Sequence, residues 1–257
     1  MTPIQKHMLQ MFIALRWGVG AIGISLPVVL AVWGGAVYGI HLPGSMSAYY
    51  HATSACSGQT AADSLAAAKA GNDGAIDPAC LAIGTGPMRN WFVGNLFFFG
   101  VAMLLMRGFS RWENWALDIA GFMAPCVALF PMNWGTKTSF SPHLTFAITF
   151  FVCVGITCVF CSQKTLKEIP PTTPNRAKVI AFYRGWYRVF AVVMVGAPIC
   201  AHLFLRNDPN RMFFVELAGV WAFGFYWLFK TYELKRSDIE GRALRGEMPH
   251  FDPRTLQ

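Results

Sequence analysis

Charged residues are scarce in this chain, and their scarcity limits the class of protein it can be. Asp, Glu, Lys and Arg make up 13% of the 257 residues, whereas soluble domains carry about 25%. Hydrophobic residues make up 54%, and the mean hydropathy is +0.41. This balance excludes an ordinary soluble domain and predicts a polytopic membrane protein.

Several motifs of known chemistry are also absent from the sequence. The chain has no HExxH or HxxxH pair, no nucleophile elbow, no P-loop and no haem-attachment motif. It also has no heptad or solenoid repeat. These absences remove the strongest sequence signals for an enzyme, so the chemistry has to be sought in scattered polar residues.

Long apolar runs are present, and six of them are long enough to cross a bilayer. A span needs about 17–25 mostly apolar residues, and a shorter run can still cross where the bilayer is thin. The sequence therefore predicts an all-α bundle of six transmembrane helices that forms a single membrane domain, residues 1–257. The expected spans are residues 17–40, 91–106, 115–132, 143–161, 189–205 and 212–229.

The placement of Lys and Arg predicts the orientation of the bundle. If the N-terminus lies inside, 16 of the 21 Lys and Arg residues fall in inner segments and five in outer ones. Cytoplasmic segments carry such an excess of basic residues. We expect both termini inside, in a bacterial inner membrane. The net charge of +8 then reflects topology and anionic lipid headgroups, and it does not indicate nucleic acid.

Three segments connect or extend the spans. The outer loop, residues 42–89, exceeds the 12–15 residues beyond which loops are usually functional or disordered. The inner segment 162–188 begins with a Pro- and Thr-rich stretch that we expect to be extended, followed by an interfacial basic and aromatic stretch. The inner tail, residues 230–257, should begin as a helix and end as a polar tail, either as a solvated extension or as a docking site for a partner.

Two of the seven cysteines, Cys56 and Cys80, lie in the outer loop and the other five in spans. Cysteines in an oxidising, periplasm-like compartment tend to pair. We therefore expect a Cys56–Cys80 disulfide that braces this loop.

Polar residues gather at the predicted outer boundary. Ionisable groups in a span are costly and normally face the bundle interior or a wet cavity. We therefore predict an outward-facing polar pocket, covered by the stretch "SAYYH" that follows the first span. The candidate pocket residues are Ser47, Tyr49, Tyr50, His51, Arg89, Asn90, His143, His202 and Glu216.

The chemistry of this pocket is open at the level of sequence. The pair His202 and Glu216 suits a structural hydrogen bond, proton or ligand chemistry, or a metal. Because a buried carboxylate needs a partner, we expect His202, His143 or Arg89 beside Glu216, with the hydroxyl of Ser47 or of a tyrosine hydrogen-bonded to this cluster. The residues His51, His143, His202 and Glu216 are of the types that bind zinc. No two of them share a helix face, so zinc is a possible cofactor and the metal ligands remain candidates. Asp118 lies near the inner face instead, where we expect it either to snorkel toward the interface or to pair with an inner arginine such as Arg107 or Arg111.

The spacing Ser47-x-x-x-His51 is similar to one motif of the alkaline ceramidase and adiponectin-receptor superfamily of intramembrane zinc hydrolases. That resemblance implies a zinc-dependent lipid hydrolase. In the superfamily the motif lies within one of seven spans and a His-x-x-x-His in the last span completes the site. Here the motif precedes the second span, and the last span has Glu216 and no His pair.

The stretches "LPGSMSAYYH", "GPMRNWFVGNLFFFG" and "RGFSRWENWALDIAGFMAPCVALFP" resemble the pattern of the DRAM/Sfk-like set of six-span proteins, over about residues 15–160. The pattern "SAYYH…RNWFVG…ALFP" also looks like an uncharacterised group of bacterial six-span membrane proteins, which is topologically similar to that set. The resemblance implies lipid handling and membrane homeostasis. Asn90 stands where the bacterial group has an acidic residue. If that acid supports an activity, this chain has kept the scaffold without it.

Three functions follow from these residues. We expect a membrane protein that binds or handles a lipid or another amphiphile in an outward-facing polar pocket, without catalysis. One alternative is a non-catalytic accessory subunit of a larger membrane complex, with other membrane proteins as partners. The second alternative is a metal-dependent lipid hydrolase.

Overall fold

The computed structural model describes residues 2–38, 42–51, 86–132, 141–158, 162–205, 208 and 210–247, and all regular structure within them is helical. The helices in chain order are α1 (Pro3–Val28), η1 (Val29–Trp33), α2 (Gly34–Tyr38), η2 (Met46–His51), α5 (Pro87–Leu105), α6 (Arg111–Leu129), α7 (Pro142–Ile156), α8 (Ser162–Lys167), α9 (Arg176–Phe204), α10 (Arg211–Arg236) and α11 (Ile239–Leu244). The predicted all-α class is confirmed for these residues.

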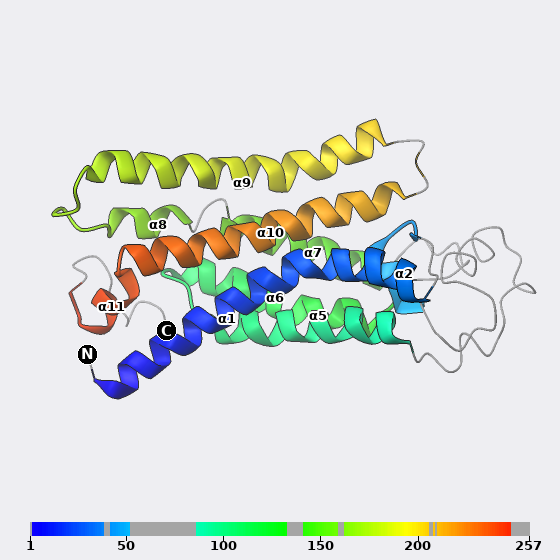
Figure 1. The fold of residues 1–257 in the computed structure, drawn as a ribbon, viewed down its shortest axis with the longest axis horizontal. Coiled ribbons are helices and arrows are strands. Elements are labelled where there is room, and N and C mark those ends of the chain that lie inside the picture. The colour runs from blue at the N-terminus through cyan, green and yellow to red at the C-terminus, as the bar shows by residue number, and fades with distance from the viewer. Residues whose placement is uncertain are drawn as a thin grey trace, which may run out of the picture.

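The six longest helices run roughly along the long axis of the molecule (Figure 1). Helix α10 packs against α1 on one side and α9 on the other, and α6 packs between α5 and α7. The start of α1, α8 and α11 lie at one end of the bundle, and α2 and the short helix η2 lie at the other (Figure 1). We call these the N-terminal end and the lid end.

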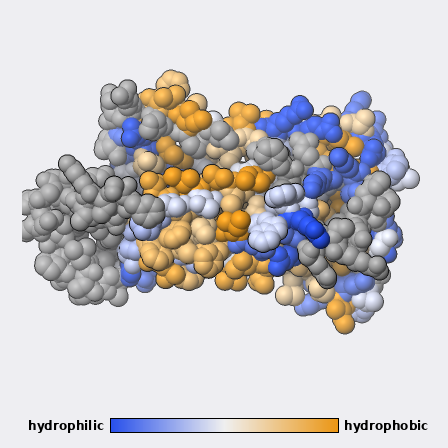
Figure 2. Space-filling view, turned by 180° about the vertical axis from the view of Figure 1, so that it is seen from behind, coloured by the Kyte–Doolittle hydropathy of each residue, from blue (hydrophilic) through white to orange (hydrophobic). Residues whose placement is uncertain are grey.

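Three helical segments are long and apolar enough to cross a membrane: Pro3–Val37, Pro87–Leu105 and Arg211–Arg236. Helix α7 is also apolar but shorter. Large hydrophobic side chains point outward from most of the long helices, and Figure 2 shows an apolar band over the middle of the molecule. Hydrophilic side chains gather at the N-terminal end. Such a band suits contact with lipid.

The inner segment 162–188 differs from its prediction. Its first residues form α8, and α9 begins at Arg176, well before the expected start of the fifth span. Tyr183 and Tyr187, four residues apart, are buried, while Arg184 between them is exposed. Residues i and i+4 share a helix face, so the basic and aromatic stretch forms an amphipathic extension of α9 that packs on the bundle.

The prediction for Asp118 is confirmed. Its carboxylate accepts two hydrogen bonds of 3.1 Å from Nη1 of Arg107. The side chains of Arg107 and Asp118 are 55% and 38% exposed, so this ion pair contributes little to stability.

Gly100 sets the distance between α5 and α6. A Cβ atom at this position would lie 2.6 Å from Pro125 and 2.7 Å from the carbonyl oxygen of Gly121. Because the Gly121 carbonyl is backbone, the two helices would have to separate to admit a methyl group.

We therefore expect Gly100→Ala to lower the free energy of unfolding by about 1–3 kcal/mol, the usual cost of overpacking. The matched control is Gly94→Ala on the same helix, where a Cβ would meet nothing within 4 Å. That substitution should be neutral or stabilising, because alanine is the better helix former. Thermal unfolding of both variants in the same detergent provides the comparison, and equal melting temperatures would contradict the close approach.

Candidate functional site

The lid end carries a polar site that begins with a tight turn before η2. The amide of Ala48 donates to the carbonyl of Ser45, at 3.2 Å, and the amide of Ser47 donates to the Ser45 hydroxyl, at 3.1 Å. The carbonyl of Gly44 accepts from the amide of Phe213, at 2.9 Å. The first amides of a helix lack intrahelical partners, so the start of α10 holds this turn against the bundle. We call residues 44–51 the lid.

Glu216 fastens the lid to α10. The Ser45 hydroxyl donates its one proton to the Glu216 carboxylate and lies 2.9 and 3.0 Å from the two oxygens, and the amide of Met46 donates at 2.6 Å. Ser45 is itself buried. A carboxylate away from bulk water requires donors of this kind, and here the lid supplies them.

Ser47 fastens the lid to α7. Nδ1 of His143 lies 3.2 and 2.8 Å from the carbonyl oxygens of Val127 and Phe130, at the end of α6. A carbonyl oxygen can only accept, so Nδ1 carries the proton. In a neutral imidazole Nε2 then accepts from the Ser47 hydroxyl, 2.9 Å away. The ring is buried and its orientation is fixed by α6.

The two lid tyrosines take different positions. The side chain of Tyr49 is fully buried, and its hydroxyl has no hydrogen-bond partner among the described residues. The hydroxyl of Tyr50 accepts from Nη2 of Arg89 at 3.0 Å, and the Arg89 guanidinium lies 4.6 Å from the ring centroid. This cation–π contact ties the lid to the start of α5.

A small cavity of about 60 Å³ lies beneath the lid, among α1, α5, α6, α7 and α10. Apolar side chains form most of its wall, including the edge-to-face ring pair of Phe150 and Phe223. Ser47 and Glu216 are the polar side chains that line it. The site is therefore polar at the lid and apolar toward the centre of the bundle.

The structure brings together only part of the predicted set. Ser47, His143 and Glu216 meet beneath the lid, and Arg89 meets Tyr50. Asn90 is exposed on α5. The side chains of His51 and His202, and both Cys56 and Cys80 with their predicted disulfide, lie outside the described residues.

The observed donors to Glu216 differ from those that we expected, which were His202, His143 or Arg89. The side chain of His202 lies outside the described residues, so its pairing with Glu216 stays a prediction. The Nε2 atom of His143 contacts Ser47, and Nη2 of Arg89 contacts Tyr50. Neutral donors of the lid reach Glu216 first, because the lid folds directly onto the start of α10.

The described residues do not include a set of side chains that could form the predicted zinc site. No group of three or more His, Cys, Asp or Glu side chains lies close enough there to hold a metal ion. Both ring nitrogens of His143 are engaged by protein groups, whereas a ligating histidine offers one nitrogen to the metal.

The hydrogen bond between Ser47 and His143 resembles that of a catalytic nucleophile and its general base. Acyl transfer also needs N–H donors that stabilise the oxyanion, and the amides at the start of the lid are already engaged. Such chemistry uses free N–H donors for the developing oxyanion. The amides of Met46, Ser47 and Ala48 are engaged by Glu216, the Ser45 hydroxyl and the Ser45 carbonyl. These three amides are therefore not free to serve as such donors.

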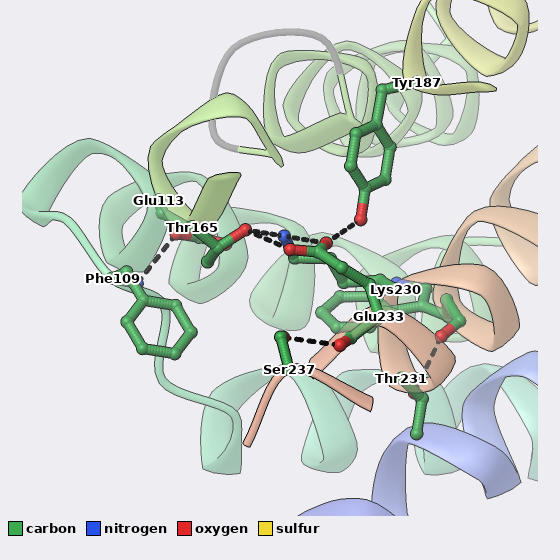
Figure 3. Close-up of polar contacts among 9 residues, drawn as sticks. Phe109, Glu113, Thr165, Tyr187, Lys230, Thr231, Glu233 and Ser237 are labelled. Atoms are coloured by element: carbon green, nitrogen blue, oxygen red, sulfur yellow. Dashed lines mark hydrogen bonds and ion pairs between the residues drawn. The ribbon is translucent and has the colours of Figure 1, made fainter. Parts of the chain in front are cut away.

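A second polar cluster near the N-terminal end is absent from the sequence predictions (Figure 3). Glu233 of α10 is fully buried and accepts hydrogen bonds from Thr165, Tyr187 and Lys230. The Lys230 ammonium lies 2.9 Å from Oε2 of Glu233, contacts the Thr165 hydroxyl, and lies 5.0 Å from the centroid of the Tyr187 ring. We call these four residues the inner cluster.

The inner cluster joins α8, α9 and α10. The i, i+3 spacing of Lys230 and Glu233 is a signal for an ion pair on one helix face, and it was available in the sequence. Thr165 and Tyr187 carried no comparable signal, because they lie in the segment that we expected to be extended or interfacial. The cluster is closed by its own partners, so it serves as a structural clamp.

Comparisons with models of protein families, with curated proteins and with solved structures found no significant match to this chain.

Proposed function

We propose that the chain is a six-span protein of the bacterial inner membrane, with both termini inside, whose lid-end pocket binds a lipid or another amphiphile. One observation carries this proposal: the cavity is apolar along most of its wall and has Ser47 and Glu216 at the lid. An amphiphile likewise has a polar group at one end and an apolar tail at the other. Its polar group would exchange hydrogen bonds with the lid, and its apolar tail would enter the bundle.

Several features support the six-span topology. Three segments meet the length and composition of a span, α7 is apolar, and α6 and α9 run beside them along the same axis. The N-terminus and α11 lie at the same end (Figure 1), as an even number of crossings requires. The excess of Lys and Arg in the inner segments supports placing that end in the cytoplasm.

The accessory-subunit alternative predicts a partner chain instead of a ligand. Purification in mild detergent from native membranes distinguishes the two, since it shows whether a lipid or another protein remains bound. The buried polar groups beneath the lid favour the ligand.

Filling the cavity tests the binding proposal. Ala147 of α7 lines the cavity, and we expect Ala147→Phe to displace the part of the tail that lies there. Each buried methylene contributes about 0.8 kcal/mol, so losing two or three costs about 2 kcal/mol, roughly thirtyfold in Kd. Photolabelling with a diazirine fatty acid, in competition with the unlabelled acid, measures the change.

The matched control is the next residue, Ile148, whose side chain is 55% exposed on the outside of α7. Ile148→Phe adds an aromatic ring to the same helix without entering the cavity, so labelling should equal that of the unmodified protein. Equal labelling of both variants would place the fatty acid on the outer surface and contradict the proposal.

A further inference from the structure

A larger cavity, of about 270 Å³, lies at the N-terminal end of the bundle, far from the lid. It is formed by the first turns of α1, the connection between α5 and α6, and α11. Its wall is mostly apolar, with Met8, Phe12 and Leu244 among its residues, and three charged side chains line it: Arg16, Arg107 and Glu240.

Arg16 lines this cavity and has one guanidinium nitrogen without a hydrogen-bond partner among the described residues. The residue is 4% exposed, and its Nη2 atom pairs with the carboxylate of Glu240. Its Nη1 atom is buried and has no hydrogen-bond partner among the described residues. Buried N–H donors are almost always satisfied, and a guanidinium presents two parallel N–H groups that match a carboxylate or a phosphate. The unpaired donor therefore indicates an acceptor beyond the described residues.

The charges around the cavity favour an anion. Glu240 would repel one, but its charge is already matched by Arg16. Arg107 pairs with Asp118 and keeps 55% of its side chain exposed, so it can turn part of its guanidinium toward an anion in the cavity. Two arginines on an apolar wall suit a ligand that is anionic at one end and apolar at the other.

The neighbouring surface indicates where such a ligand comes from. Met8 is 47% exposed, and Ile4 and Met11 of the same helix are 73% and 60% exposed. Lys6 and His7, between them, are exposed as well. A helix that presents apolar and basic residues together is typical of the membrane interface. The cavity therefore opens beside the level of the lipid headgroups.

We propose that this cavity binds the phosphate group of an anionic phospholipid, with Arg16 Nη1 and Arg107 as donors and the apolar wall against the first part of the acyl chains. The site is separate from the lid-end pocket and does not depend on the function proposed for that pocket. A bound lipid would also hold α1, α11 and the α5–α6 connection together.

The test uses the full chain, purified and delipidated in detergent, with native mass spectrometry to count bound lipid. The probes are phosphatidylglycerol, phosphatidylcholine and inorganic phosphate. We expect phosphatidylglycerol to bind about tenfold more tightly than phosphatidylcholine, because the choline group is a cation that offsets the phosphate charge and is repelled by the two arginines. Arg107→Gln and Arg16→Gln should each reduce that binding by about fivefold to tenfold.

The matched control is Arg184→Gln on α9, which removes the same charge from an exposed position that does not line the cavity. It should leave phosphatidylglycerol binding unchanged. Arg107→Gln changes a largely exposed residue, so it keeps the test informative even if Arg16→Gln disturbs the fold. Equal binding of the two lipids, an equal loss in Arg184→Gln, or displacement of the lipid by inorganic phosphate would each overturn the proposal.

Discussion

Replacing Glu233 with alanine should lower the free energy of unfolding by about 3–5 kcal/mol, the usual cost of leaving one partner of a buried ion pair alone. Lys230 is 3% exposed and would lose the carboxylate oxygen that lies 2.9 Å from its ammonium group. Tyr187 and Thr165 would lose their acceptor at the same time. The loss is measured by unfolding the purified protein in mixed micelles with an increasing fraction of denaturing detergent.

A double variant distinguishes the cost of leaving a charge unpaired from the cost of losing side-chain volume. Replacing both members, as Lys230→Met with Glu233→Leu, removes the uncompensated charge and fills similar volumes. Apolar replacement of a whole buried pair is often neutral, so this variant should recover most of the stability that Glu233→Ala loses. If the double variant is as unstable as the single one, the ion pair is not the source of the effect.

The second large effect is expected at Glu216. Glu216→Ala removes the acceptor for the Ser45 hydroxyl and the Met46 amide, and each buried donor left unsatisfied costs about 1–3 kcal/mol. The lid should therefore open more readily by about 2 kcal/mol, which raises amide exchange roughly thirtyfold. Hydrogen exchange with mass spectrometry on a peptide that covers residues 44–51 measures this opening.

Glu216→Gln is the graded control, because its amide oxygen still accepts from one of the two donors. Exchange in the lid should fall between that of the unmodified protein and Glu216→Ala, while peptides from α9 should not change in either variant. An unchanged lid in Glu216→Ala would show that Ser47 and His143 hold it without the carboxylate.

Some side-chain contacts could be anticipated from local spacing and topology. The pairing of Asp118 with Arg107 followed from their common depth near one face. The placement of "SAYYH" over Glu216 followed from the cost of a buried carboxylate. The observed donors to Glu216 are a serine hydroxyl and a backbone amide of the lid, whereas the prediction named His202, His143 or Arg89. The side chain of His202 lies outside the described residues, so that pairing stays a prediction.

Other contacts depended on elements that are distant in sequence. The pair His143–Ser47 spans 96 positions, and Thr165–Glu233 spans 68. The early start of α9 was also missed, since the proline-rich stretch before it reads as extended, while burial of Tyr183 and Tyr187 stabilises a helix there. Tertiary packing often overrides local propensity in this way.

The sequence by itself determined the helical class and the approximate position of the long apolar helices, because both follow from local composition. It also determined that polar residues gather at the lid, because polar groups are costly in an apolar medium. Only the tertiary structure decided which polar atoms meet. Hydrogen bonds act over about 3 Å, and the rotation and crossing of each helix, set by contacts such as Gly100 against Gly121, determine which side chains come within that distance.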